Sequence, residues 1–378
     1  MTDKDKNINK VPNLRFPGFE SEWEVRKLKD IATFYSGGTP LTSKKEYFDG
    51  NIPFIRSGEI NSDKTEQFIS ELGLKNSSAK MVEVGDVLYA LYGATSGEVG
   101  ISKIKGAINQ AVLCIKIDNE QYFLASYLRY KKEDITKTYL QGGQGNLSAE
   151  IIKNLKISFP SIQEQKKISD FLSSLDSKIQ TQRKTIQNLE SLMKGMSQKL
   201  FTQKIRFKEF TDEWKEIKLE EVCVKQSSNI SANKIEDNFG DFPIYGATGF
   251  LKNVDFYEVE KDYIAIIKDG AGVGRLFLCS GKSSVLGTLD IIKPKNINLY
   301  FLYCLLSNIN FDKYSTGSTI PHIYFKDYKN EFCQIPCIEE QTKIADFLSK
   351  IYDKIETEKK ILELLEQQKK YFLQNLFI

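Results

Sequence analysis

The chain contains 378 residues, more than one ordinary domain core accommodates, so we expect two domains. Its composition, 41% hydrophobic and 12% aromatic, excludes a largely disordered chain, and a formal net charge of +3 is too small to indicate a nucleic-acid partner by itself. No apolar run is long enough to span a bilayer, the first residues do not resemble a signal peptide, and the six cysteines show no disulfide spacing. We therefore expect a cytoplasmic protein without a membrane partner.

Two sequence markers each occur twice. RFPGFESEW at 15–23 recurs as RFKEFTDEW at 206–214, and PSIQEQKKISDFLS at 160–173 recurs as PCIEEQTKIADFLS at 336–349. Over the 20 residues that begin at Pro160, 12 are identical to those that begin at Pro336. Such self-similarity predicts two copies of one module.

The markers divide the chain into five segments. We expect a polar tail at 1–14, a first body at 15–160, a helical segment at 161–205, a second body at 206–335 and a second helical segment at 336–378. The markers that frame a body are 137 residues apart in the first copy and 122 in the second. Similar frames around different interiors predict one scaffold that reads two different ligands.

Each body has the pattern of a mixed, β-rich domain. In the first body, VGDVLYALYG (84–93) and AVLCIKI (111–117) predict strands, and 121–131 predicts a helix. In the second body, YIAIIKDG (263–270) and LDIIKP (289–294) predict strands, and 298–308 predicts a helix. The expected fold class is α+β, with two such bodies related by internal duplication.

In the helical segment that follows each body, apolar residues alternate three and four positions apart, which places one narrow apolar stripe on each helix. A helix over 164–201 would be about 57 Å long, roughly the length of 16 base pairs of B-DNA, which suits a spacer. The alternative is that each helix packs only on its own body. We expect the helices to pair as an antiparallel coiled coil through Ile168, Leu172, Leu175, Ile179, Ile186, Leu189, Ile344, Leu348, Ile351, Ile355, Leu362 and Leu365.

Motifs that suggest catalysis fail on their spacing. SGKSS at 280–284 lacks the first glycine of a phosphate loop, and GAGVG at 270–274 reads as a hairpin turn, because RLFLC reads as a returning strand. Cys333 and Cys337 have no second pair of ligands and read as small buried hydrophobes, and His322 is the only histidine. We expect no catalytic residue, no metal site and no bound cofactor in this chain.

The polar, glycine-rich loops suit recognition of DNA. Arginine pairs with guanine and asparagine or glutamine with adenine, while hydroxyls and backbone amides bind phosphates. The prediction rests on clustering, because each residue alone fits an ordinary turn. The candidate DNA-binding residues are Thr39, Tyr47, Arg56, Ser57, Tyr92, Thr95, Asn109, Gln110, Gln141, Gln144, Asn146, Tyr245, Thr248, Lys268, Arg275, Thr316, Ser318, Thr319 and His322.

The duplicated RFxxFxxxW and PxxxEQxKIxDFLS markers, with GGTPLTSKKEYFDGNIPFIRSGEI at 37–60 and GAINQ at 106–110, resemble the specificity subunit of type I restriction-modification systems. The resemblance covers residues 14–378. It implies that each body is a target-recognition domain for one half of a bipartite DNA site and that the paired helices set the gap between the halves. The subunit itself would be non-catalytic.

The same resemblance implies the partners. They would be double-stranded DNA, two modification subunits that methylate adenine, and two restriction subunits that act as motor endonucleases. S-adenosylmethionine, ATP and Mg²⁺ would be bound by those subunits and not by this chain.

Two alternatives stay open at this point. The chain could be a free-standing DNA methyltransferase or nuclease, although the amino-methylation motif and a metal-binding carboxylate cluster are absent from its sequence. It could also be a coiled-coil scaffold that binds proteins alone. Sequence preference in DNA binding separates the scaffold from the specificity subunit.

Overall fold

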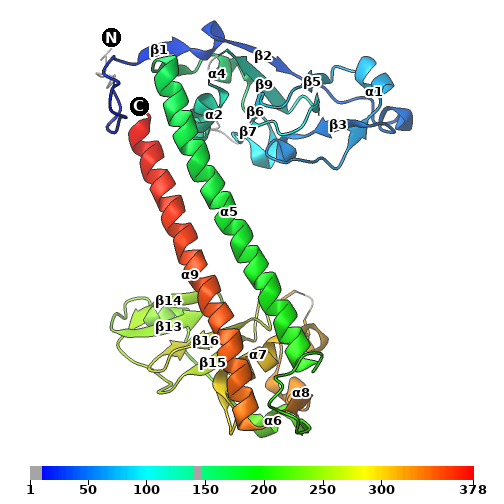
Figure 1. Ribbon diagram of the computed structural model, residues 1–378, viewed down its shortest axis with the longest axis vertical. Helices are drawn as coiled ribbons and strands as arrows, with labels where there is room; N and C mark the ends of the chain where they lie inside the picture. The colour runs from blue at the N-terminus through cyan, green and yellow to red at the C-terminus, as the bar shows by residue number, and fades with distance from the viewer. Residues whose placement is uncertain (1–10, 119, 140–145, 318) are drawn as a thin grey trace. The chain divides into compact units, whose positions relative to one another are not determined.

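The computed structural model describes residues 11–118, 120–139, 146–317 and 319–378, and it divides into two compact units (Figure 1). Unit 1 extends to Arg183 and also includes 361–378, whereas unit 2 comprises 184–360. Each of two long helices, α5 (Ile162–Phe201) and α9 (Ile338–Leu376), has one part in unit 1 and the other part in unit 2. No helix among the described residues is long and apolar enough to cross a membrane.

Unit 1 is built on two four-stranded sheets and a short strand pair. One sheet has the order β2-β9-β6-β7, with β2 (Ala32–Ser36), β9 (Val112–Ile117), β6 (Val87–Ala90) and β7 (Val99–Ile101). The other has the order β4-β3-β8-β5, with β4 (Phe68–Ile69), β3 (Ile52–Ile55), β8 (Gly106–Ile108) and β5 (Lys80–Val82). The antiparallel pair comprises β1 (Glu24–Lys27) and β10 (Lys156–Phe159).

The helices of unit 1 close its core. Phe123 on α2 (Gln121–Tyr130) is fully buried beside Trp23, with ring centroids 5.9 Å apart. Phe377, just after α9, packs on Phe123 at 5.3 Å and belongs to the same cluster. The shorter helices are α1 (Glu71–Lys75), α3 (Lys132–Tyr139) and α4 (Ala149–Lys153).

Unit 2 repeats this plan. Its four-stranded sheet has the order β12-β18-β15-β16, with β12 (Cys223–Ser227), β18 (Leu289–Pro294), β15 (Tyr263–Ile267) and β16 (Leu276–Cys279). Its three-stranded sheet has the order β14-β13-β17, with β14 (Gly249–Val254), β13 (Phe242–Gly246) and β17 (Ser284–Val285). The strand pair is β11 (Lys215–Lys218) with β19 (Phe332–Ile335), and the helices are α6 (Leu219–Val222), α7 (Leu299–Ser307) and α8 (Phe325–Tyr328).

These elements confirm the mixed α+β class and the duplication. The four predicted strands correspond to β6, β9, β15 and β18, and the two predicted helices to α2 and α7. Residues 270–274 connect β15 to β16, which pair antiparallel, so this glycine-rich segment is a hairpin connection, as its pattern indicates. The alternation of apolar residues is informative here because each strand has a face in the core.

The start of α5 packs against the end of α9 in unit 1, so the two helices run antiparallel there. Phe171 and Phe372 have ring centroids 4.7 Å apart, and Lys369 pairs with Asp176 at 2.5 Å. In unit 2 the two helices also contact each other, where Lys359 on α9 pairs with Glu190 on α5 at 3.2 Å.

The residues of the predicted apolar stripe have two roles. Ile168 and Leu172 lie in the core of unit 1, and Ile344 and Leu348 lie in the core of unit 2, so these parts of the helices also pack on the bodies. At its start, each helix therefore packs on its own body, as the alternative to helix pairing predicts. Of the other stripe residues, Leu175, Ile179, Ile186 and Ile355 are buried, and Leu189, Ile351, Leu362 and Leu365 are half-buried.

The two repeated sequence markers contact each other in unit 1. The guanidinium of Arg15 donates two hydrogen bonds of 2.7 Å to Glu164, whose side chain is only 1% exposed. Arg15 also donates to the carbonyl of Ser21 at 2.7 Å. The next residue, Gln165, donates to the carbonyl of Pro160 at 2.9 Å, which fixes the start of α5. We call the Arg15–Glu164 contact the first lock.

Unit 2 contains the same arrangement, which we call the second lock. Arg206 donates to both carboxylate oxygens of Glu340 at 2.8 and 2.7 Å, and Gln341 donates to the carbonyl of Pro336 at 3.0 Å. The indole of Trp214 also donates to Glu340, at 3.1 Å. Each lock therefore joins the entry of a body to the helix that leaves it.

We predict that Arg15→Ala lowers the free energy of unfolding of unit 1 by about 3–5 kcal/mol, because it leaves a buried carboxylate without its cation. Urea unfolding followed by hydrogen–deuterium exchange of the backbone amides of unit 1 measures this loss. The matched control is Arg26→Ala, which breaks a pair with Glu24 in which both side chains are well exposed, and it should leave stability nearly unchanged. Equal effects of the two substitutions would show that the first lock does not stabilise the unit.

Candidate nucleic-acid interface

Parallel pairing of β3 with β8 brings two candidate loops together in unit 1. Ile55 lies opposite Ile108 in this ladder, so the residues that follow, Arg56 and Asn109, leave the sheet at the same edge. The side chain of Asn109 accepts a hydrogen bond from the backbone amide of Ala111 at 3.1 Å, which shapes the turn after β8.

Gly37 brings a third loop to this edge. The amide of Gly37 donates to the carbonyl of Asn109 at 3.2 Å, and a Cβ at this position would lie only 1.7 Å from the carbonyl oxygen of Ile108. Only glycine allows this approach. Beyond it, the hydroxyl of Thr39 donates to the side chain of Gln110 at 2.7 Å, with both residues exposed.

Leu91 links two further loops to the same place. Its amide donates to the carbonyl of Ala111 at 2.8 Å, and its carbonyl accepts from the amide of Leu147 at 2.8 Å and from the hydroxyl of Ser96 at 3.0 Å. The neighbouring candidates therefore lie at one edge of unit 1. We call this set the first loop cluster: Thr39, Arg56, Ser57, Tyr92, Thr95, Asn109, Gln110 and Asn146, of which Thr39, Tyr92, Gln110 and Asn146 are exposed.

Arg56 is held by acids of its own loop. It pairs with Glu59 at 3.1 Å and with Glu66 at 2.7 Å. Burial alone would raise the pKa of Glu59, but hydrogen bonds from the Arg56 guanidinium and from the backbone amides of Glu66 and Arg56 lower it to about 2. The charged carboxylate therefore orders the loop from 56 to 66.

Tyr47 corrects the sequence-based prediction. Its side chain is 6% exposed, so in this structure it supports the loop from inside and is not presented to a ligand. Its hydroxyl accepts from the Lys44 ammonium at 3.1 Å. An aromatic residue in a polar loop gives no sequence signal for this burial, which depends on contacts with α1. Gln141 and Gln144 lie outside the described residues.

Lys268 occupies in unit 2 the position that Leu91 has in unit 1. Its amide donates to the carbonyl of Thr288 at 3.0 Å, and its carbonyl accepts from the amide of Ile323 at 2.9 Å. The adjoining residue His322 forms a β-bridge with Thr316 and another with Asp269. Three candidates, Lys268, His322 and Thr316, are thus brought together.

Tyr245 joins this group through the parallel pair of β13 and β17. Its carbonyl accepts from the amide of Leu286 at 2.9 Å, and its hydroxyl lies 3.4 Å from that of Ser280. Thr248 is exposed in the β13–β14 turn, and Arg275 is exposed before β16. The second loop cluster comprises Tyr245, Thr248, Lys268, Arg275, Thr316, Thr319 and His322, whereas Ser318 lies outside the described residues.

One functional partner of Lys268 is absent from the sequence-based set. Asp290 on β18 is almost fully buried and accepts from the Lys268 ammonium at 3.1 Å and from the Ser227 hydroxyl at 3.0 Å. The acid partly neutralises Lys268 and fixes its direction. Its signal was a single charge in the otherwise apolar run LDII, which marks a buried polar contact.

Within the described ranges, no group of three or more histidine, cysteine or acidic side chains is placed to hold a metal ion. Cys333 is buried, as expected for a small apolar residue, but Cys337 is exposed, which corrects that expectation. The geometry therefore consists of two polar loop clusters on equivalent scaffolds.

Comparison with known proteins matches these two copies. The family model described as the type I restriction modification DNA specificity domain matches residues 20–191 and 211–367. The MjaVIII type I restriction enzyme specificity subunit of Methanocaldococcus jannaschii is 27% identical, over 97% of this chain and 94% of its own length. The EcoR124I/EcoR124II specificity subunit of Escherichia coli is 25% identical over 47% of this chain and 46% of its own length.

The fold is also similar to a solved structure. The crystal structure of a type I restriction-modification S subunit from M. genitalium gives a TM-score of 0.71 with 19% sequence identity, and it covers 97% of this chain and 99% of that one.

We predict that Glu59→Gln destabilises unit 1 at pH 7 and that its difference from the wild type disappears as the pH falls from about 4.5 to about 2. The folded-state pKa lies below the ordinary value, so the stabilisation is present above pH 4.5 and is lost as the carboxylate takes up a proton. Urea unfolding across this pH range measures the difference. Glu66→Gln is the control, because its side chain is 83% exposed, and a pH-independent defect in Glu59→Gln would contradict the assignment.

Proposed function

The chain belongs to the type I restriction-modification DNA specificity family, and we propose that it is the subunit that selects the DNA target of such an enzyme in the cytoplasm. One observation carries the proposal: the same scaffold presents two loop clusters whose residues differ. Residues 15–160 and 206–335 are then the two target-recognition domains, and 161–205 and 336–378 form the spacer.

The side chains of the clusters suit contacts with bases and phosphates. Gln110 and Asn146 can pair with adenine, and Arg275 with guanine, while Thr248 can donate to a phosphate. Thr39 donates to the Gln110 side chain and so orients it. Because the clusters share a backbone plan but not their side chains, each reads a different half of a bipartite site. Two equivalent scaffolds with different side chains thus recognise a DNA site whose two halves differ in sequence.

In this proposal the chain itself performs no chemistry. Two modification subunits methylate adenine with S-adenosylmethionine, and two restriction subunits use ATP and Mg²⁺, while this chain binds no cofactor. Neither a free-standing methyltransferase or nuclease nor a protein scaffold has support among the compared proteins, which are specificity subunits.

The recognition role is tested by replacing residues 206–335 with the second body of another family member. We expect genome-wide mapping of methylated adenine, in cells with an active methyltransferase, to show one half of the bipartite site changed and the other retained. A methylation pattern that is identical with and without this gene would show that the chain does not select the target.

The spacer role makes a separate prediction. Four residues inserted between Ile179 and Ile186, with four inserted between Leu362 and Lys369 of the opposite helix, add about 6 Å to each helix. We expect the gap between the half-sites to grow by about one to two base pairs without a change in either half. The same mapping measures it, and altered half-sites with an unchanged gap would contradict the division of roles.

A further inference from the structure

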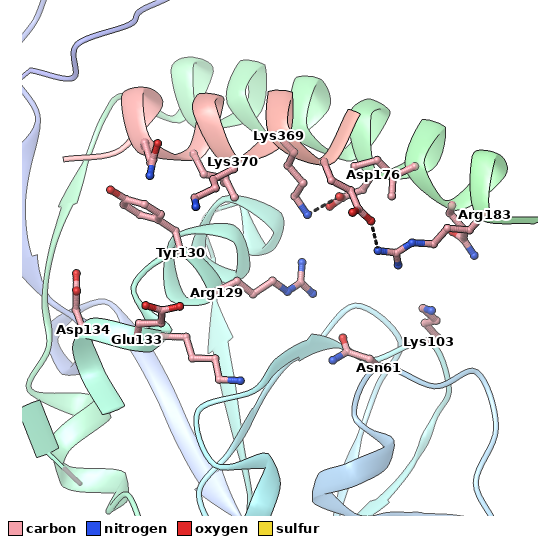
Figure 2. A pocket seen from close by; sticks show the side chains of 16 residues that line it. Asn61, Lys103, Arg129, Tyr130, Glu133, Asp134, Asp176, Arg183, Lys369 and Lys370 are labelled. Carbon is pink, nitrogen blue, oxygen red and sulfur yellow. Dashed lines mark hydrogen bonds and ion pairs between the residues drawn. The ribbon is translucent and has the colours of Figure 1, made fainter. Parts of the chain in front are cut away.

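A cleft of about 1110 Å³ lies within unit 1, between the first body and the two helices (Figure 2). Its body side is formed by α2, α3 and the turn between β7 and β8, and its helix side by α5 and α9. The candidate residues of the first loop cluster do not line it.

The charges that line this cleft do not balance. Each of its four acids has a cation: Asp176 pairs with Lys369 and Glu366 with Arg183, both within the cleft, while Glu133 pairs with Lys137 and Asp134 with Lys131, outside it. Lys132, a further lining cation, pairs with Glu98.

Three lining cations remain: Lys103, Arg129 and Lys370 have no acidic partner among the ion pairs of the described residues. Arg129 is anchored because its Nε donates to the carbonyl of Val99 at 2.9 Å, so the rest of its guanidinium reaches into the cleft (Figure 2). Lys103 lies across from the helices, and Lys370 extends from α9 (Figure 2). The cleft therefore presents positive charge from both sides.

The cleft adjoins the first loop cluster. Asn61 lines the cleft and lies in the same loop as Arg56 of the cluster. Lys132 also lines the cleft, and it contacts Glu98, three residues after Thr95 of the cluster. A strand bound at the loop cluster can therefore continue into the cleft without leaving the surface of unit 1.

The corresponding place in unit 2 is different. Phe123 and Phe301 both pack on the repeated tryptophan, which aligns α2 with α7 and places Ser307 where Arg129 lies. The repeat likewise replaces Asp176 by Tyr352, and the pocket there measures about 330 Å³ and contains Tyr303 and Tyr352. The first copy therefore has a cationic cleft where the second copy has a smaller pocket that contains two tyrosines.

We propose that this cleft binds the sugar–phosphate backbone of the target DNA beside the half-site read by the first body. This inference rests on the proposed function. Arg129, Lys103 and Lys370 contact phosphates there, and they contribute affinity without reading bases. Bound DNA thus has more backbone contacts next to one half-site than next to the other.

The test measures binding of the full-length chain to two duplexes, one that contains the target mapped by methylation and one with a scrambled sequence. The salt concentration is varied from about 0.05 to about 0.3 M, around physiological ionic strength. Arg129→Gln should lower the magnitude of the slope of log K against log salt by about 0.9. It should weaken binding to both duplexes about eightfold at 0.1 M salt, so that the ratio of the two binding constants is unchanged. Lys103→Gln, at an exposed turn position, should do the same. Lys105→Gln is the matched control, because Lys105 pairs with Glu83 and does not line the cleft.

The outcomes are distinguishable. If the wild type does not prefer the target duplex, the proposed function fails, whatever the variants show. If the wild type prefers the target but Arg129→Gln and Lys103→Gln bind like Lys105→Gln, the cleft assignment is overturned. It is also overturned if the variants bind DNA normally but lose assembly with the modification subunit in size-exclusion chromatography, because the cleft then holds an acidic protein segment.

Discussion

Each unit depends on one buried ion pair between segments that are far apart in the chain. Arg15 meets Glu164 across 149 residues, and Arg206 meets Glu340 across 134. A carboxylate that is 1% exposed is tolerated only with a cation and further hydrogen bonds, and the arginine fork supplies both. The pair fixes where the chain enters a body and where it leaves as a helix, so the direction of that helix relative to the sheets follows from it.

The locks explain why the copies are similar in some places and different in others. Residues that make the lock recur, because any change there leaves a charge buried alone. Loops at the edge of the sheets meet no such constraint: Leu91 and Lys268 make the same backbone hydrogen bonds although their side chains have nothing in common. Backbone bonds maintain the scaffold and leave the side chains free to suit a ligand. The cationic cleft beside α2 is one such difference between equivalent scaffolds.

Much of the fold could be predicted from the sequence, because strands and helices with a buried face show their period in the order of apolar residues. The repeated markers likewise showed the duplication, but not that Arg15 and Glu164 touch, since nothing in either marker encodes a contact over that distance. The burial of Tyr47 and the pairing of Lys268 with Asp290 could not be predicted from the sequence for the same reason, because both depend on tertiary neighbours. Arg129 had a weak signal, a single charge in an otherwise uncharged helix.

The packing of Leu376 and Phe377 into the core around Trp23 and Phe123 has a consequence for biosynthesis. At ordinary elongation rates, Phe377 leaves the ribosome on the order of tens of seconds after Phe123. During that interval the first body exposes the apolar surface that Phe377 later covers, whereas the core of unit 2 is complete once Leu348 has emerged. The unit whose synthesis begins first is therefore the last to finish folding, and a prematurely terminated chain would lack a complete first core.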